Sequence, residues 1–145
     1  MTDDIALRTA TPDEIPALLA LWAAAAKGTS ISDDEAGVAA LLARDPHCLL
    51  VATPADDPAT LLGTVIAGWD GWRAHLYRLA VDPAHRRRGI GAALLAAAEE
   101  RLAALGARRI DAMVLDENEL GHRTWKAAGY APEPQWSRWV KPLPR

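Results

Sequence analysis

The stretch Leu79-Ala-Val-Asp-Pro-Ala-His-Arg-Arg-Arg-Gly-Ile-Gly-Ala-Ala-Leu-Leu95 decides the fold of this chain. Its first residues suit the end of a buried strand, which stops at Asp82-Pro83 because proline has no N–H to pair. Three arginines and the run Gly89-Ile90-Gly91 come next. Apolar residues then recur at helical spacing from Ile90 until Gly106, which supplies a stop signal. The stretch therefore predicts a strand, a short basic loop and a helix.

This arrangement favours the binding of an anion at the start of the helix. Glycines let a ligand approach the backbone, the N–H groups of the first helical turn lack partners, and the helix dipole adds partial positive charge. Arginine side chains beside those N–H groups can pair with phosphate oxygens. A diphosphate fits such a loop. The alternative is a capped helix whose basic start is only solvated.

Two other phosphate-binding motifs do not match the sequence. A P-loop needs G-x-x-x-x-G-K followed by Ser or Thr, and the chain has no Lys-Ser or Lys-Thr pair. A dinucleotide-binding fingerprint needs G-x-G-x-x-G, whereas the last position after Gly89 and Gly91 is Leu94. What does match is the pattern Arg86-x-x-Gly89-x-Gly91, placed directly after a strand.

That pattern closely resembles Arg/Gln-x-x-Gly-x-Gly/Ala, the acetyl-CoA-binding signature of the GNAT superfamily of N-acetyltransferases. In that family the loop holds the pyrophosphate of the coenzyme. The resemblance implies acetyl-CoA as the acyl-donating cosubstrate, without a metal. The coenzyme-binding residues that it implies are Leu79, Ala80, Val81, Arg86, Arg87, Arg88, Gly89, Ile90, Gly91, Ala92, Asn118 and Trp125.

The resemblance continues beyond this helix. A strand is expected over residues 109–115, followed by Asn118, a short helix and Ala127-Ala-Gly-Tyr130. The family likewise has an asparagine after its fifth strand, and its next helix ends in Gly-Phe or Gly-Tyr. Asn118 is expected to bond the pantetheine arm or to cap its own helix. The match is specific from about Trp69 to Tyr130 and only architectural elsewhere.

The remaining segments complete a single domain over residues 1–145. Capping boxes at Thr11 and Ser32 open two helices, which Gly28 and Pro46 close. A two-residue turn, Asp70-Gly71, is expected between the third and fourth strands. Strands are expected over residues 5–8, 47–52, 61–69 and 72–81, with one or two more after Tyr130.

The order of these elements predicts an α/β fold. The fourth strand, the glycine-led helix and the fifth strand form one β-α-β crossover, so these two strands should be parallel. The result is a mixed, mostly antiparallel sheet flanked by helices. The resemblance implies this same GNAT-like architecture, with the fourth and fifth strands splayed apart so that the pantetheine arm enters the gap.

The composition of the chain narrows the classes of binding partner to be expected. The net charge of −3 creates no field that would favour nucleic acid or an anionic membrane. Residues 17–26 are apolar but too short to span a bilayer. The single cysteine, Cys48, excludes an internal disulfide and is expected in the core, and Cys and His are too few for a structural zinc site. We expect a cytoplasmic protein.

The fourth strand offers the candidate catalytic residues. Period-two alternation puts His75, Tyr77, Leu79 and Val81 on one face. The resemblance implies that backbone N–H groups near Leu79 to Val81 polarise the thioester carbonyl. It also places His75 near a glutamate that serves some members as general base, and histidine can accept a proton near neutral pH. The alternatives are an exposed or hydrogen-bonded His75, and an ordinary packing role for Tyr77.

Trp125 departs from the family pattern. Many members have a tyrosine at this position, whereas an indole N–H donates hydrogen bonds but is not a useful proton source. Trp125 is therefore expected to pack beside the thioester sulfur, while water or Tyr77 protonates the thiolate and Tyr130 belongs to the core. The hairpin tip near Asp70, together with residues 33–35, could line an acidic entrance for a cationic amine or be solvated surface charge.

The residues and the resemblance together predict transfer of an acetyl group from acetyl-CoA to a primary amine by direct attack in a ternary complex. A small metabolite, an amino sugar, a polyamine and a protein N-terminus all remain open as acceptors. The alternative is a non-catalytic acyl-CoA-binding or sensing domain, which Trp125 keeps open. The Trp-rich C-terminal segment would form a homodimer surface if it is exposed.

Overall fold

The computed structural model describes residues 4–25, 30–114 and 118–144. In chain order its elements are β1 (Ile5–Thr9), η1 (Pro12–Glu14), α1 (Ile15–Ala25), α2 (Glu35–Arg44), β2 (Leu49–Pro54), β3 (Gly63–Trp69), β4 (Ala74–Val81), η2 (Pro83–His85), α3 (Ile90–Leu105), β5 (Ile110–Ala112) and α4 (Glu119–Ala127). The elements η1 and η2 are single turns of 3₁₀-helix.

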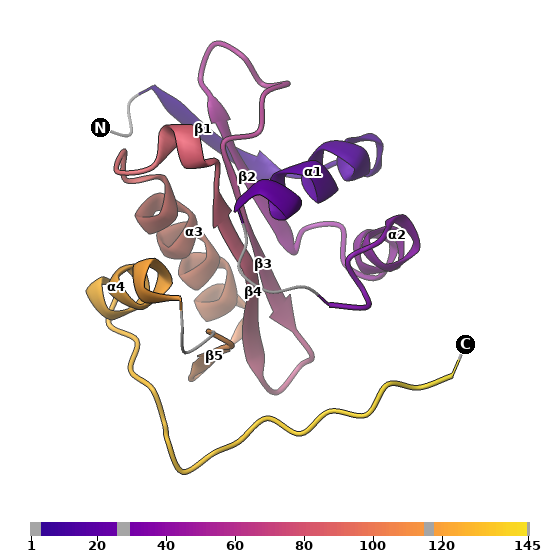
Figure 1. Ribbon diagram of the computed structural model, residues 1–145, viewed down its shortest axis with the longest axis vertical. Helices are drawn as coiled ribbons and strands as arrows, with labels where there is room; N and C mark the ends of the chain where they lie inside the picture. Colours follow the sequence, from indigo (N-terminus) through magenta and orange to yellow (C-terminus); the bar gives the residue numbers. More distant parts are fainter. Residues whose placement is uncertain (1–3, 26–29, 115–117, 145) are drawn as a thin grey trace.

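The described residues form one five-stranded sheet, against which the helices pack. Its strands follow the order β1-β2-β3-β4-β5, with antiparallel pairing up to β4 and parallel pairing between β4 and β5. Helices α1 and α2 cover one face, and α3 and α4 lie on the other (Figure 1). The expected mixed sheet with helices on both faces and one β-α-β crossover is confirmed.

Each face has its own hydrophobic core. Beneath α3, side chains such as Leu94 and Leu102 pack on Leu76 of β4, and Trp125 joins them from α4. Beneath α1 and α2, the core includes Trp22 and Cys48. The expected core position of Cys48 is confirmed, since it is 1% exposed and burial raises the pKa of its thiol to about 11.

The helix starts agree with the sequence at Thr11 but not at Ser32. The Glu14 carboxylate accepts a hydrogen bond from the Thr11 N–H at 3.0 Å, as the first capping box predicts. The second prediction was wrong, because Asp34 caps α2 by accepting from the Gly37 N–H at 2.7 Å. The Ser32 hydroxyl instead bonds Ser30. The predicted stop at Gly28 lies outside the described residues.

The turn between β3 and β4 is longer than predicted. Trp69 pairs directly with Ala74, so the connection holds four residues, 70–73, and Trp72 projects into solvent. The Asp70 carboxylate explains this, because it accepts hydrogen bonds at 2.7 Å from the backbone N–H groups of Trp72 and Arg73. A side chain that binds two successive N–H groups stabilises this wider loop over a two-residue turn.

The predicted strands at the C-terminal end are shorter or absent. Pairing between β4 and β5 covers only three residues of each strand, within the range 109–115 expected for β5, and residue 115 lies outside the described part. Residues 131–144 contain no strand and run as extended chain away from the body (Figure 1). Four prolines interrupt this segment, and each removes an N–H that a strand would need.

We predict that Gly63→Ala destabilises the fold while Gly68→Ala on the same strand does not. A Cβ at Gly63 would lie 2.9 Å from the Ala80 carbonyl oxygen and 3.0 Å from Leu94 Cδ1, whereas at Gly68 the nearest atom is 3.6 Å away. Overpacking of this kind costs about 1–3 kcal/mol. Urea unfolding of the two variants measures the difference, and equal midpoints would contradict the packing described for β3.

Candidate active site

A cavity of about 890 Å³ lies between the C-terminal half of β4, the first turns of α3 and one side of α4. It brings together eleven of the twelve residues for which the sequence predicted a coenzyme-binding role. These are Leu79, Ala80, Val81, Arg86, Arg87, Gly89, Ile90, Gly91, Ala92, Asn118 and Trp125. Ala80 contributes backbone here, because its side chain packs in the core beneath α1 and α2.

The start of α3 has the geometry of an anion site. Gly89 is the N-cap with a φ of 77°, a left-handed conformation that glycine adopts without strain. The Gly89 carbonyl accepts its intrahelical hydrogen bond from Ala93, so the three N–H groups between them have no partner within the helix. Arg86 and Arg87 line the same cavity. These groups suit the oxygens of a diphosphate.

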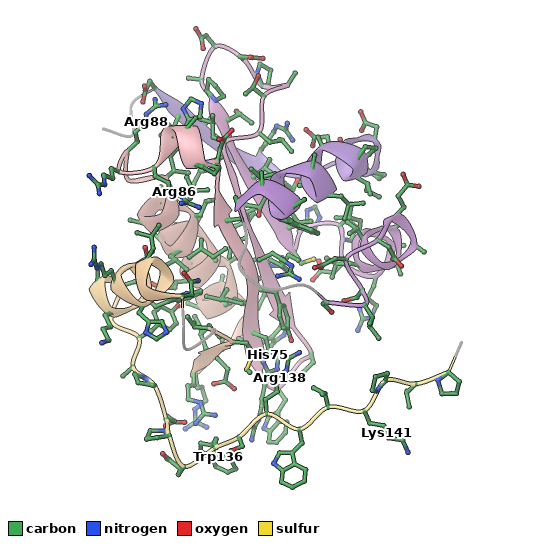
Figure 2. All side chains as sticks on the ribbon, viewed as in Figure 1. His75, Arg86, Arg88, Trp136, Arg138 and Lys141 are labelled. Carbon is green, nitrogen blue, oxygen red and sulfur yellow. The ribbon has the colours of Figure 1, made fainter. Side chains whose placement is uncertain are left out.

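The three arginines of the loop have different surroundings. The Arg86 guanidinium donates to the Ala25 carbonyl at the end of α1 at 3.4 Å and remains at the cavity. Arg88 does not line the cavity. The Arg88 guanidinium pairs with the Asp4 carboxylate at 2.7 Å and lies 2.9 Å from Nδ1 of His85. Arg86 and Arg88 are both labelled in Figure 2. Arg88 therefore links the loop to the N-terminal segment.

Several lining residues were not predicted from the sequence. On α3, Ala96 and Glu99 line the cavity four and seven residues after Ala92, which was predicted, and on α4 Gly121 and Thr124 line it. Small residues at helical spacing were the sequence signal that would have indicated Ala96, Gly121 and Thr124. Small side chains on both helices leave room for an extended ligand between them.

Trp125 forms one wall of the cavity, with only 8% of its surface exposed. Its ring meets the Tyr130 ring edge to face at 5.0 Å between centroids. The Tyr130 hydroxyl donates to the Glu99 carboxylate at 2.7 Å and so joins the end of α4 to α3. Burial and this hydrogen bond raise the pKa of Tyr130. Tyr130 therefore stays protonated and engaged, as a structural residue.

Asn118 has the capping role that was one of its two predicted alternatives. Its side-chain oxygen accepts from the Gly121 N–H at 3.0 Å, which fixes the first turn of α4. It also lines the cavity. One residue thus shapes the helix start and the wall of the site.

A bulge breaks the alternation that was predicted along β4. Thr64 pairs with Ala80 and Ile66 pairs with Tyr77, so two residues of β4, Arg78 and Leu79, lie opposite Val65 alone. Arg78 has a φ of 53°, which is uncommon for a residue with a side chain. An extra residue in a strand reverses the facing of those that follow.

The predicted common face for His75, Tyr77, Leu79 and Val81 was therefore wrong. Leu79 and Val81 pack against the core beneath α3, together with Ala74 and Leu76. His75 and Tyr77 precede the bulge and alternate with Ala74 and Leu76, so they face the side of α1 and α2. The bulge separates the predicted catalytic side chains from the cavity by the thickness of the sheet.

The sheet opens beside this bulge. The last pair between β4 and β5 is Leu76 with Ala112, so the segment from Tyr77 to Val81 has no partner on that side among the described residues. This matches the splayed strands that the resemblance implied. The gap lies beside the cavity beneath α3, which Leu79, Ala80 and Val81 line.

His75 and Tyr77 lie on the opposite face of the sheet, near the hairpin end of β4, with their ring centroids 6.0 Å apart. Figure 2 labels His75. Burial raises the pKa of the Tyr77 phenol, which keeps it protonated at neutral pH. Three of the carboxylates expected at an acidic entrance are engaged in other contacts: Asp33 pairs with Arg78, Asp34 caps α2 and Asp70 holds its own loop.

Comparison with known proteins identifies the family. The model of the acetyltransferase (GNAT) family matches residues 15–130, and this chain belongs to that family. An acetyltransferase of Pectobacterium atrosepticum is 33% identical over 113 residues, 78% of each chain. Among solved structures, Ard1 of Thermoplasma volcanium superposes with a TM-score of 0.77 at 19% identity, over 88% of this chain and 83% of that one. The yncA protein of Salmonella typhimurium, solved with its cofactor acetyl-CoA, has a TM-score of 0.69 at 18% identity, covering 89% and 80%.

The described residues hold neither a candidate membrane-spanning helix nor a candidate metal-ion site. No helix within 4–25, 30–114 and 118–144 has the length and apolar character to cross a membrane. The same residues include no group of three or more His, Cys, Asp and Glu side chains placed to hold a metal ion.

We predict that Gly91→Val weakens acetyl-CoA binding while Gly91→Ala preserves it. A Cβ at Gly91 meets nothing closer than Thr124 Cγ2 at 3.6 Å, so the fold accepts it, but the two further methyl groups of valine would enter the cavity. We expect a loss of about tenfold or more for valine and under about threefold for alanine. Calorimetric titration measures both, and equal affinities for the wild type and Gly91→Val would contradict the assignment.

Proposed function

We propose that this chain transfers the acetyl group of acetyl-CoA to a primary amine, by direct attack of the amine on the thioester in a ternary complex. The observation that carries the proposal is the gap between β4 and β5. In this proposal the gap joins the cavity and its anion-binding helix end, on one face of the sheet, to the titratable side chains on the other. Donor and acceptor can thus approach from opposite faces and meet at the bulge.

The residues of the cavity suit the donor. The first turn of α3 with Arg86 and Arg87 would hold the diphosphate, because free N–H groups and guanidinium groups both bind phosphate oxygens. The backbone from Leu79 to Val81 would bond the pantetheine amides as an added strand bonds a sheet edge. An N–H in this segment would also donate to the thioester oxygen, where negative charge develops during attack.

The opposite face suits the acceptor. His75 lies four residues before Leu79, about 13 Å along an extended strand, so it would take the proton of the amine by way of water. Tyr77 is 47% exposed and stands between His75 and the gap. Burial raises the pKa of its phenol, which therefore stays protonated and can donate a hydrogen bond but cannot act as a base.

The departing thiolate would leave beside Trp125, which lines the cavity and has no proton to give at neutral pH. Water would protonate it, since Tyr77 lies on the opposite face of the sheet. Trp125 is also the reason to keep the non-catalytic alternative, an acyl-CoA-binding or sensing domain, as an outcome of the test. The name of the Pectobacterium relative, an acetyltransferase, supports the catalytic reading.

A CoA-release assay over a panel of amines tests the proposal. The panel contains polyamines, amino sugars, small amine metabolites and peptides with free N-termini, each offered with acetyl-CoA. We expect thiol release that depends on the protein and on one class of amine, with acetylated product confirmed by mass. Calorimetric binding of acetyl-CoA without release for any amine would instead support the non-catalytic alternative.

We predict that His75→Ala lowers kcat/KM by about 10²-fold, the lower end for loss of a general base. The rise of kcat/KM with pH on the acidic side should disappear, because the group that must be unprotonated is gone. Affinity for acetyl-CoA should stay unchanged. His47→Ala, at an exposed histidine before β2, is the matched control. An unchanged rate and pH profile in His75→Ala would remove this residue from the mechanism.

We further propose that the chain works in the cytoplasm as a homodimer. Its single cysteine, buried in the core, favours the cytoplasm over an oxidising compartment. The C-terminal segment exposes Trp136, Trp139, Val140 and Leu143, with Trp139 91% exposed, and such a surface favours association. Figure 2 shows this segment extended beyond the sheet.

We predict a solution mass by light scattering of twice the 15.6 kDa of one chain. Replacing Trp136 and Trp139 together by serine should yield the monomer, because the apolar surface is then lost. Trp72→Ser removes an equally exposed tryptophan from the 70–73 loop and should leave the dimer intact. A monomeric wild type would reject this part of the proposal.

A further inference from the structure

A buried chain of hydrogen bonds connects α1 to the bulge of β4. The Trp22 indole N–H donates to the Thr64 hydroxyl at 2.8 Å, and that hydroxyl donates to the Arg78 carbonyl at 2.8 Å. Thr64 is fully buried and Trp22 nearly so. A hydroxyl has one proton, so its bond to Arg78 and the incoming indole N–H leave it a single orientation.

These two hydrogen bonds determine the direction of one peptide group. The Thr64 hydroxyl lies on the side of the sheet that Trp22 and α1 cover, so the Arg78 carbonyl points to that side. No peptide bond in the described residues is cis, and in a trans peptide the carbonyl and the following N–H point in opposite directions. The Leu79 N–H therefore points toward the face of α3, where Leu79 lines the cavity.

Arg78 is held at its unusual φ by further contacts. Its guanidinium makes a two-point pair with the Asp33 carboxylate and lies 6.0 Å over the Trp22 ring. Backbone conformations of this kind persist only where the surroundings hold them. Trp22 thus supports Arg78 in two ways. Its ring lies beneath the guanidinium, and its N–H begins the series of hydrogen bonds that ends at the Arg78 carbonyl.

We propose that Thr64 and Trp22 are positioning residues for acyl transfer: they hold the Arg78–Leu79 peptide so that the Leu79 N–H donates to the thioester oxygen. The inference rests on the proposed function. In the reaction the amine nitrogen bonds the thioester carbon and negative charge moves onto the oxygen. The C–S bond then breaks, the thiolate takes up a proton, and the nitrogen gives one up. The N–H is already aimed before this charge develops, so no reorganisation is needed.

The competing explanation is that the hydrogen bonds from Trp22 to Thr64 and from Thr64 to Arg78 only stabilise the fold. Losing a buried hydrogen bond would then lower stability without changing how the bound thioester is polarised. The stretching frequency of the thioester carbonyl separates the two, because a hydrogen bond to the oxygen lowers that frequency. Acetyl-CoA labelled with ¹³C at this carbonyl gives a band that can be followed in the complex, with no acceptor present.

The experiment compares Thr64→Val, which keeps the shape and loses the hydroxyl, with Thr64→Ser, which keeps the hydroxyl. We expect the wild type and Thr64→Ser to shift the carbonyl band to lower frequency, and Thr64→Val to lose most of that shift. With an acceptor, kcat should fall about tenfold in Thr64→Val, part of the 10²–10³ that a lost oxyanion donor costs. Affinity for acetyl-CoA should change by less than about threefold.

Trp22→Phe provides a second test that does not depend on the folding of Thr64→Val. It keeps a ring beneath Arg78 and removes the N–H, so we expect a smaller loss of the same kind. The double variant should be no worse than Thr64→Val alone, because Trp22 acts through Thr64. A full carbonyl shift in both single variants would overturn the proposal, and so would a loss in Thr64→Ser equal to that in Thr64→Val.

The outcomes also separate this inference from the proposed function. A wild type that shifts the carbonyl band but acetylates no amine would defeat the proposed function and leave the role of Thr64 in polarisation standing. A wild type that acetylates an amine, with Thr64→Val matching it in rate and band position, would defeat the inference and leave the function standing.

Discussion

The structure depends on where β5 stops pairing with β4. Only three residues of each strand are joined, and beyond Leu76 the two strands part. A parallel strand that continued would close the sheet and separate its two faces completely. Because pairing ends early, a gap without a partner strand among the described residues opens along β4, beside the cavity beneath α3. The bulge at Arg78 and Leu79 lies at its edge.

The two faces of the sheet carry different kinds of side chain beside this gap. Small side chains of α3 and α4 line the donor cavity, together with the free N–H groups of a helix start and two arginines. The other face has aromatic and titratable side chains before the bulge and the Arg78–Asp33 pair at it. In the proposed function, one side would hold a long anionic ligand and the other would move protons.

Local signals in the sequence predicted the local parts of this arrangement. The strand, basic loop and helix around Gly89, the cap at Thr11 and the burial of Cys48 each depend on neighbouring residues or on plain hydrophobicity, and they were predicted correctly. The bulge was not, because it sits at an arginine and is held by Trp22, Asp33 and Thr64, which come from other parts of the chain. No window around Arg78 contains that information.

Other differences from the local pattern arise from partners both near and far along the chain. Arg88 looks equivalent to its two neighbours, but Asp4, more than eighty residues earlier, pairs with it. The cap at Ser32 was displaced to Asp34, and the Asp70 carboxylate widened a turn that its own residue type had suggested would be tight. In each case a polar side chain found a partner that the local pattern did not name.

The burial of Cys48 has a consequence for a protein that handles thioesters. A thiolate exposed near bound acetyl-CoA would exchange with it and acylate the protein itself, because thiolates attack thioester carbonyls readily. The only thiol of this chain lies in the core beneath α1 and α2, on the far side of the sheet from the cavity, and burial raises its pKa to about 11. The packing of the core shields this cysteine from acylation, so that in the proposed function the acetyl group would be kept for the acceptor.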